Sequence, residues 1–187
     1  MDYFNFFLFF ISYSFFGYLM EMIKLSIENK RFVKRGFLLG PWCPVYGMGY
    51  IVILFITRFK NNILLVCLFS FFLIGILEYL TSFLLEKFFN ARWWDYSKRK
   101  FNLDGRICLS NLFLFSFYGL IAIYIVNPFL NEFFMKIPHI ITIIILIIFL
   151  LDVVVSVTVI SRLKIRKSKN KDNTEEINKK VKDVILD

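Results

Sequence analysis

The sequence predicts an all-α, polytopic integral membrane protein: a bundle of about five transmembrane helices. Of its 187 residues, 58% are hydrophobic and only 20% are charged, whereas a soluble domain has about 45–50% apolar and about 25% charged residues. The apolar residues fall in blocks of about 20, the length of helix that crosses a hydrocarbon core of about 30 Å. Lys and Arg concentrate on one side of those blocks. This composition excludes a soluble globular enzyme, a disordered protein and a disulfide scaffold.

The apolar blocks define a transmembrane domain over residues 1–163, followed by a charged cytoplasmic tail, residues 164–187. The second block is short unless it begins within the preceding segment rich in Gly and Pro. Pro128 is expected to end or kink the fourth block, because proline lacks a backbone donor and clashes with the preceding turn. In the tail, apolar residues at helical spacing between 177 and 185 predict a short amphipathic helix. The predicted spans are about 3–25, 42–59, 62–89, 107–130 and 137–163.

The positions of Lys and Arg predict the orientation. Of the 23 basic residues, 20 lie in the segments 24–35 and 87–106 and from residue 162 onward, on one side of the five spans. Because cytoplasmic loops are enriched in Lys and Arg, we expect the N-terminus outside and the C-terminus inside the bacterial cytoplasmic membrane. Five crossings, an odd number, place the two termini on opposite sides of the membrane, which agrees with this orientation.

Charge, cysteine and histidine point to no further chemistry. A net charge of +9 would suggest nucleic acid in a soluble protein, but here it is expected to orient the loops and contact the anionic lipid bilayer. We therefore expect no nucleic-acid partner. Cys43, Cys67 and Cys108 lack CxxC spacing, and His139 has no ligand-spaced partner. We expect no disulfide, no metal site and no cofactor.

Three acids lie within apolar spans: Glu21, Glu78 and Asp152. An acid at mid-bilayer costs about 2.5–3.5 kcal/mol on insertion scales, so each is expected to face protein or water. Polar residues at helical spacing extend one face of the Glu78 helix as far as Glu86. One interpretation is a water-filled inner cavity in which these four acids line a pathway for a cation or a polar substrate group.

The alternative interpretation is structural. The acids then pair with Arg35, Arg92 or Arg106 and fix the packing of the helices. Asp152 is the most isolated acid, and desolvation would keep its carboxyl protonated. The sequence leaves both interpretations open.

The segment 36–49 holds four glycines and two prolines. Pro41 and Pro44 break a helix, and glycine permits tight turns and close helix approach. At membrane depth such backbone is tolerated only where it is buried in protein or lines a cavity. We therefore expect Pro41, Pro44 and Tyr46 to line the substrate pathway. The alternative is an interfacial turn followed by a packing face of small residues.

The loop 90–106 combines aromatic, basic and acidic residues. Trp93, Trp94 and Tyr96 have apolar rings with polar tips, which are typical of interfacial anchors. The basic residues of the loop, Arg92 among them, suit anionic headgroups.

The acids of this loop would neither anchor it in the interface nor bind anionic headgroups. Asp95 and Asp104 are expected to cap turns or to pair with Arg92 and Arg106. Asn102 and Asp104, with the glycine that follows, are expected to begin the helix of the fourth span.

The chain resembles a known family through an ordered set of motifs, of which Trp-Trp-Asp-Tyr-Ser followed by Gly-Arg-Ile is the most specific. The set consists of Gly36-Phe37-Leu38-Leu39-Gly40-Pro41, Pro44-Val45-Tyr46-Gly47, Glu78-Tyr79, Thr81-Ser82, Glu86, Arg92-Trp93-Trp94-Asp95-Tyr96-Ser97, Asn102 and Gly105-Arg106-Ile107-Cys108-Leu109. It is similar to the bacterial ABC-transporter permease family called ABC-transporter type IV, over about residues 3–163. The resemblance implies a multi-span inner-membrane protein and, less directly, transport.

Three functions remain open. The first is the permease subunit of an ABC-type transporter. No GxxxxGK[ST] loop is present, so this would need a separate ATPase subunit docked on the loop 90–106. Since five spans make a small pathway, a homodimer is expected. The second is a membrane enzyme acting on a lipid or lipid-linked substrate, since acids, arginines, Tyr46 and Tyr96 crowd one interface. The third is a non-catalytic assembly protein in which the same groups only lock the bundle.

Overall fold

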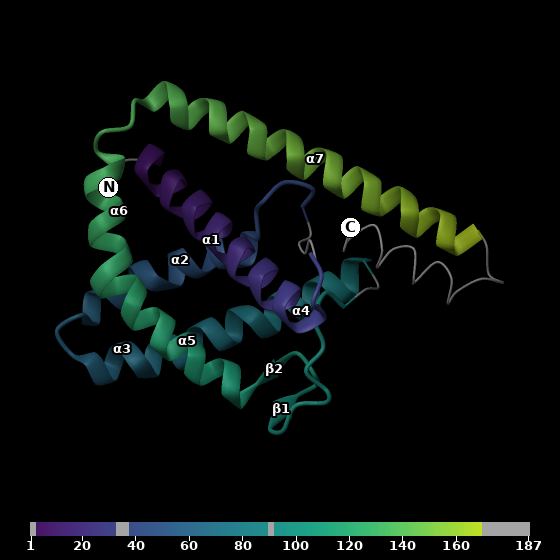
Figure 1. The fold of residues 1–187 in the computed structure, drawn as a ribbon, viewed down its shortest axis with the longest axis horizontal. Coiled ribbons are helices and arrows are strands. Elements are labelled where there is room, and N and C mark those ends of the chain that lie inside the picture. The colour runs from purple at the N-terminus through teal and green to yellow at the C-terminus, as the bar shows by residue number, and fades with distance from the viewer. Residues whose placement is uncertain (1–2, 33–37, 90–91, 170–187) are drawn as a thin grey trace.

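The computed structural model describes residues 3–32, 38–89 and 92–169, without the side chains of residues 28 and 163–169. Within these ranges, four helices are long and apolar enough to cross a membrane (Figure 1). They confirm the predicted all-α membrane bundle. The four candidate spans are Tyr3–Ile27, Ile63–Phe89, Leu109–Phe134 and His139–Arg162.

The second predicted span, 42–59, is a shorter helix. It consists of α2 (Pro44–Ile56) and a 3₁₀ turn, η1 (Thr57–Phe59). At 1.5 Å per residue this helix is about 24 Å long, less than the hydrocarbon core of about 30 Å.

The reason is that α2 begins about halfway along α1 (Tyr3–Asn29). The Cys43 amide donates to the Ser14 carbonyl at 3.0 Å, and further along the helix Tyr50 stacks on Phe9 at 4.7 Å between ring centroids. These contacts set α2 antiparallel to α1. Residues 38–43 before it are not helical, as the glycine and proline pattern predicts.

The next two long helices each contain a π-helical turn. The first joins α3 (Ile63–Phe69), η2 (Ser70–Ile74) and α4 (Gly75–Phe89). The second joins α5 (Leu109–Ile121), η3 (Ala122–Val126) and α6 (Asn127–Phe134). π-helical turns within longer α-helices are frequent at functional sites.

Pro128 does not end its helix, which continues to Phe134. The π-helical turn just before it changes the hydrogen-bonding register, and the Asn127 amide donates to the Ala122 carbonyl five residues back. Figure 1 shows a bend between α5 and α6. The expectation of a kink is thus confirmed and that of a helix end is wrong.

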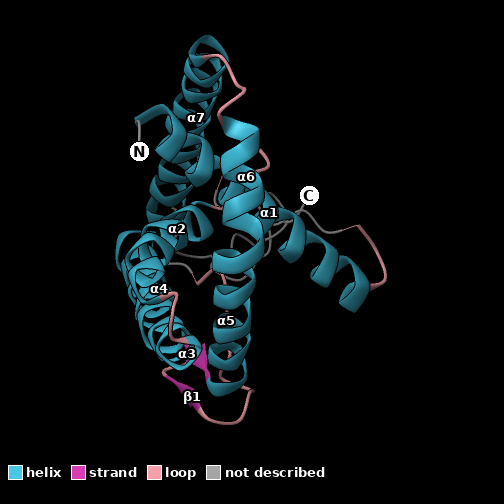
Figure 2. Ribbon diagram, turned by 90° about the vertical axis from the view of Figure 1, so that its left-hand side faces the viewer, coloured by secondary structure: helices cyan, strands magenta, loops and turns pink. Residues whose placement is uncertain are grey.

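The last helix, α7 (His139–Lys169), continues past the predicted end at residue 163. The predicted amphipathic helix of the tail lies outside the described residues. A small antiparallel hairpin, β1 (Asn102–Leu103) and β2 (Ile107–Cys108), precedes α5. Figures 1 and 2 both show the hairpin and α7 on opposite sides of the molecule.

Aromatic and aliphatic side chains fill one end of the α1–α2 contact. Glycines let the two helices approach: a Cβ at Gly47 would meet Ser14 and Phe10, and one at Gly17 would meet the Tyr46 ring. Small residues serve the same purpose in many membrane helix pairs. The buried cluster at this end consists of Leu8, Phe9, Tyr50, Leu130 and Phe134.

Candidate functional site

A cavity of about 230 Å³ lies beside the other end of the α1–α2 contact. Its walls come from α1, α2, the helix α3–η2–α4 and the helix α5–η3–α6. The loop 92–108 supplies part of the wall as well. Both π-helical turns contribute a lining residue. The cavity is lined by Tyr13, Glu21, Cys43, Pro44, Val45, Tyr46, Gly49, Ile53, Ile74, Leu77, Glu78, Thr81, Leu85, Trp93, Trp94, Tyr96, Phe115, Tyr118, Gly119 and Ala122.

The first carboxylate of the cavity is Glu21 of α1. The hydroxyl of Tyr46, in the first turn of α2, donates to its Oε1 at 2.8 Å. Pro44 begins α2 at the cavity wall, where a missing amide is tolerated because the first amides of a helix lack intrahelical partners. Glu21, Pro44 and Tyr46 therefore all line the cavity.

The second carboxylate is Glu78 of α4, whose exposed fraction is only 8%. The Tyr96 hydroxyl, from the loop, donates to its Oε1 at 3.1 Å. Its other oxygen, Oε2, is buried and has no hydrogen-bond partner among the described residues. A buried carboxylate oxygen without a hydrogen bond is unusual and calls for an explanation.

The polar face of α4 divides between two surroundings. Glu78 and Thr81 line the cavity. Ser82 instead accepts a hydrogen bond from the Arg106 guanidinium at 3.3 Å. Glu86, further along, pairs with the arginines of the loop and does not line the cavity.

Glu86 fastens both ends of the loop to α4. Its Oε1 lies 3.0 Å from Arg92 Nε, and its Oε2 lies 2.6 Å from an Arg106 guanidinium nitrogen. The hydrogen bond from the Arg92 side chain is the main reason that the pKa of Arg92 lies above its ordinary value. Arg106 also lies over the rings of Tyr79 and Phe83, which adds cation–π attraction. The structural interpretation, in which an acid pairs with arginine, therefore holds for Glu86.

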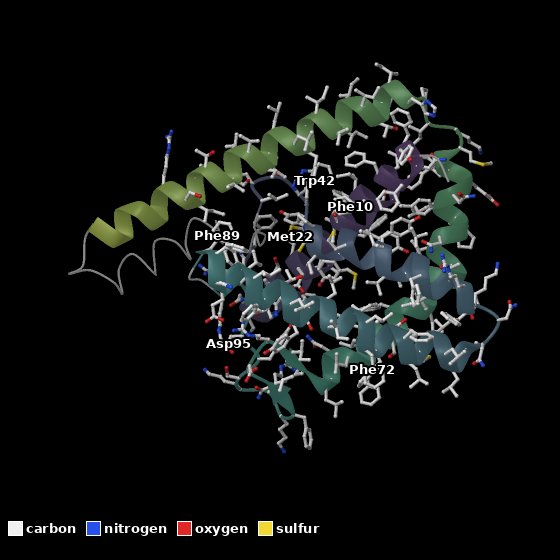
Figure 3. The ribbon with its side chains drawn as sticks, turned by 180° about the vertical axis from the view of Figure 1, so that it is seen from behind. Phe10, Met22, Trp42, Phe72, Phe89 and Asp95 are labelled. Atoms are coloured by element: carbon white, nitrogen blue, oxygen red, sulfur yellow. The ribbon has the colours of Figure 1, made fainter. Side chains whose placement is uncertain are left out.

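The aromatic residues of the loop turn toward the bundle. Trp93, Trp94 and Tyr96 all line the cavity, and the Trp94 indole donates to the Arg106 carbonyl at 2.9 Å. Figure 3 shows Asp95, on the same loop, to one side of α4 near the end of the helix that carries Phe89. Asp95 accepts hydrogen bonds from the hydroxyl and the amide of Ser97, which lower the pKa of its carboxyl.

Asn102 begins a hairpin and not a helix. Its Oδ1 accepts from the Gly105 amide at 2.9 Å, and its side-chain amide donates to the Arg99 carbonyl at 2.8 Å. Asp104 has positive φ and accepts from the Tyr79 hydroxyl at 2.7 Å. The expected helix start here is therefore wrong, since α5 begins at Leu109. The Asp104-Gly105 pair, which lies between Leu103 and Arg106, is a hairpin signal that the sequence already carried.

The comparisons with known proteins identify one family. Residues 8–158 match the family described as "Putative ABC-transporter type IV". The chain belongs to this family. No curated protein and no solved structure matches the chain.

In this ABC-transporter type IV protein, the matched region includes every residue that lines the cavity and the whole of the loop 92–108. The family description refers to transport and names no substrate. The membrane helices and the family together establish an ABC-transporter-related membrane protein.

Asp152 is not isolated in this member of the family. The Gly40 amide donates to its Oδ2 at 3.0 Å, and the Ser156 hydroxyl donates to its Oδ1 at 3.2 Å. Ser156 in turn accepts from the Leu39 amide at 2.9 Å. The non-helical segment 38–43 leaves amides without helical partners, and α7 satisfies two of them. Neither Asp152 nor Pro41 lines the cavity.

The sequence predicts that the acids and arginines converge at one interface, where they would act on a lipid headgroup. In the structure Arg92 and Arg106 are engaged by Glu86, away from the cavity. Pairing of the acids with Arg35 falls outside the described residues. Among the described residues no group of three or more His, Cys, Asp or Glu side chains is placed to hold a metal.

Several residues of the cavity wall are not predictable from the sequence. Phe115, Tyr118 and Gly119 come from α5, and Tyr13 comes from α1. These residues look like ordinary residues of an apolar span, and no pattern separates those that face a cavity from those that face lipid. Gly49 also lines the cavity, and in the structure a Cβ there would meet nothing within 4 Å.

Proposed function

We propose that this protein is the membrane subunit of an ABC-type transporter and that the cavity is the place where its cargo binds. The observation that carries the proposal is the pair of carboxylates, Glu21 and Glu78, on facing elements of a cavity inside an apolar bundle. Ionisable groups within membrane spans usually mark substrate or ion pathways, because burying them there is unfavourable.

The short helix α2 supports this proposal. Its first turn lies at the cavity wall and about halfway along α1. Transporter folds commonly place such interrupted helices at the binding site, near the middle of the bilayer. Non-helical backbone at that depth needs protein or water around it, and here α7 supplies acceptors through Asp152 and Ser156.

The loop 92–108 is suited to control access. Tyr96 reaches Glu78 inside the cavity, while Arg92 and Arg106 hold the ends of the loop against Glu86. Moving the loop would break these contacts and uncover the cavity. We propose that an ATPase subunit drives this movement, since the chain has no nucleotide-binding GxxxxGK[ST] loop of its own.

The basic tip of the loop is our proposed docking surface for that subunit. Lys98, Arg99 and Lys100 are all exposed, so their side chains are accessible to a partner with acidic groups. The same basic residues favour a cytoplasmic position, and we propose that the loop lies in the cytoplasm of a bacterial cell, with the N-terminus of the chain outside and the C-terminus inside. Two copies of the chain would give a pathway larger than one small bundle provides.

The experiment is purification of the tagged protein from native membranes in a mild detergent. We expect an ATPase subunit to co-purify with the natural sequence and to be lost from the triple variant K98E/R99E/K100E. Lys136→Glu, an exposed charge reversal beyond α6, is the matched control and should retain the partner. Absence of any ATPase from the natural protein would overturn the permease assignment.

A further inference from the structure

The chemistry of the cavity lining identifies the class of cargo. We infer that the cavity binds a compact organic cation, a substituted ammonium group, with Glu78 as its counter-charge. The statement that this cation is transported rests on the proposed function, but its binding does not. The inference is carried by the charge of the lining, by its aromatic side chains and by one buried oxygen.

The ionisable side chains of the lining that favour one sign of ligand charge are acidic. Glu21 and Glu78 line the cavity, and no Lys or Arg of the described residues does. Lys24 and the side-chain amide of Asn111 interact with the Glu78 carboxyl, but neither residue lines the cavity. An anion entering the cavity would face two carboxylates, whereas a cation would be attracted by both.

Glu78 offers a specific position for that cation. Its Oε1 is occupied by the Tyr96 hydroxyl, but its Oε2 is buried and lacks a hydrogen-bond partner among the described residues. Leaving a charged acceptor unsatisfied in an apolar setting is costly. An ammonium group beside Oε2 would supply the missing interaction, and the Tyr96 bond already fixes the orientation of the carboxylate.

The walls suit a cation with an apolar surface. Seven aromatic side chains from the described residues line the cavity, among them Trp93, Trp94 and Tyr46. Aromatic faces attract ammonium groups, and aromatic cages are the usual means of recognising substituted ammonium ions. A small inorganic ion would gain little from such walls, because it prefers several oxygen ligands.

Two further features bear on the choice of ligand. The first turn of α2 also lines the cavity, and helix N-termini favour negative charge. Glu21 already supplies such a charge there, through its contact with Tyr46 of that turn. The volume of about 230 Å³ lies below the range of about 300–1,000 Å³ for pockets that hold drug-sized ligands, which favours a compact cation.

The test measures binding of choline to the purified protein in detergent. The probes are choline, its neutral carbon isostere 3,3-dimethylbutan-1-ol and the anion 3,3-dimethylbutanoate. Binding is followed by thermal unfolding and by tryptophan fluorescence. The fluorescence is measured in a Trp42→Phe background, because Trp42 does not line the cavity whereas Trp93 and Trp94 do. We expect only choline to raise the unfolding temperature and change the fluorescence.

Variants then assign the binding to Glu78. Glu78→Gln should weaken choline binding about tenfold or more, equivalent to about 1.4 kcal/mol. Glu132→Gln, the same change at an exposed acid of α6, should leave it unaltered. If Glu78→Gln does not fold, Gly49→Leu serves instead, because its side chain would enter the cavity without meeting another atom at its Cβ.

Equal binding of the neutral isostere, preference for the anion, no response to choline, or unchanged affinity in both variants would each overturn the inference. None of these results affects the co-purification of an ATPase subunit. Conversely, choline binding without an ATPase partner would retain the site and remove the permease assignment. The two proposals therefore fail separately.

Discussion

The two ends of the contact between α1 and α2 are built differently from similar residues. At one end aromatic rings pack against one another: Phe9 stacks on Tyr50 and meets the edge of Phe134, with 4.9 Å between those last two centroids. At the other end the rings of Tyr13, Tyr46 and their neighbours line a cavity. Aromatic content alone therefore does not decide whether a region becomes core or site.

The difference follows from the polar groups. The buried cluster of the packed end is apolar except for the Tyr50 hydroxyl. The cavity end holds Glu21 and Glu78, whose carboxylates are each oriented by a tyrosine hydroxyl. Because a buried carboxylate has more acceptor positions than one hydroxyl can fill, close packing around it would leave oxygens unsatisfied. Space for a ligand or water is the consequence.

The largest expected effect is the removal of a ring from the packed end. Phe9, which is 3% exposed, should lose about 3–5 kcal/mol of unfolding free energy on substitution by alanine, because a cavity replaces its contacts. Phe115→Ala, in the cavity wall, should lose less than half of that, since its ring already borders open space. Thermal unfolding in detergent compares the two variants, and equal losses would contradict the distinction between the two ends.

A smaller effect should separate two glycines that lie two residues apart in α2. Gly47→Leu drives a side chain into Ser14 and Phe10 of α1, and overpacking of this kind costs about 1–3 kcal/mol. Gly49→Leu should leave the unfolding temperature within a few degrees of the natural value, because nothing lies within 4 Å of its Cβ. Both are measured by thermal unfolding and by the monodisperse fraction in size-exclusion chromatography.

The same pair tests the cavity itself. Gly49→Leu should fill part of the space and reduce choline binding despite normal stability. If instead Gly49→Leu unfolded the protein and Gly47→Leu did not, the packing of α2 against α1 described above would be wrong.

Much of this architecture is predictable from the sequence. Block length and composition predict the membrane helices, and the rarity of acids in apolar spans singles out Glu21 and Glu78. What those acids contact is not predictable, because partners such as Tyr96 come from distant parts of the chain. Asp152 illustrates this: its sequence neighbours are apolar, yet its hydrogen bonds come from Ser156 and from Gly40, 112 residues earlier.

Other errors had a local cause. Asn102 and Asp104 predict the start of a helix, because both residue types favour that position. The same residues favour tight turns, and Gly105, with φ of +67°, decides for the hairpin. The short length of α2 was visible in the sequence, but its starting point beside Ser14 depends on a contact across the bundle.

The smallest expected effect concerns the loop that borders the cavity. The Ser97 hydroxyl is the main cause of the lowered pKa of Asp95, and the Ser97 amide also contributes. A carboxyl with a lowered pKa stabilises the folded loop above its unfolded value of about 3.9, and this stabilisation is lost as the pH falls through the folded value. Ser97→Ala removes the hydroxyl and keeps the amide, so the pKa should rise part of the way toward 3.9. A carboxyl carbon-13 titration in micelles measures the shift. An unchanged value would mean that the charges of Arg92 and Lys98, and not the turn, hold the carboxylate ionised.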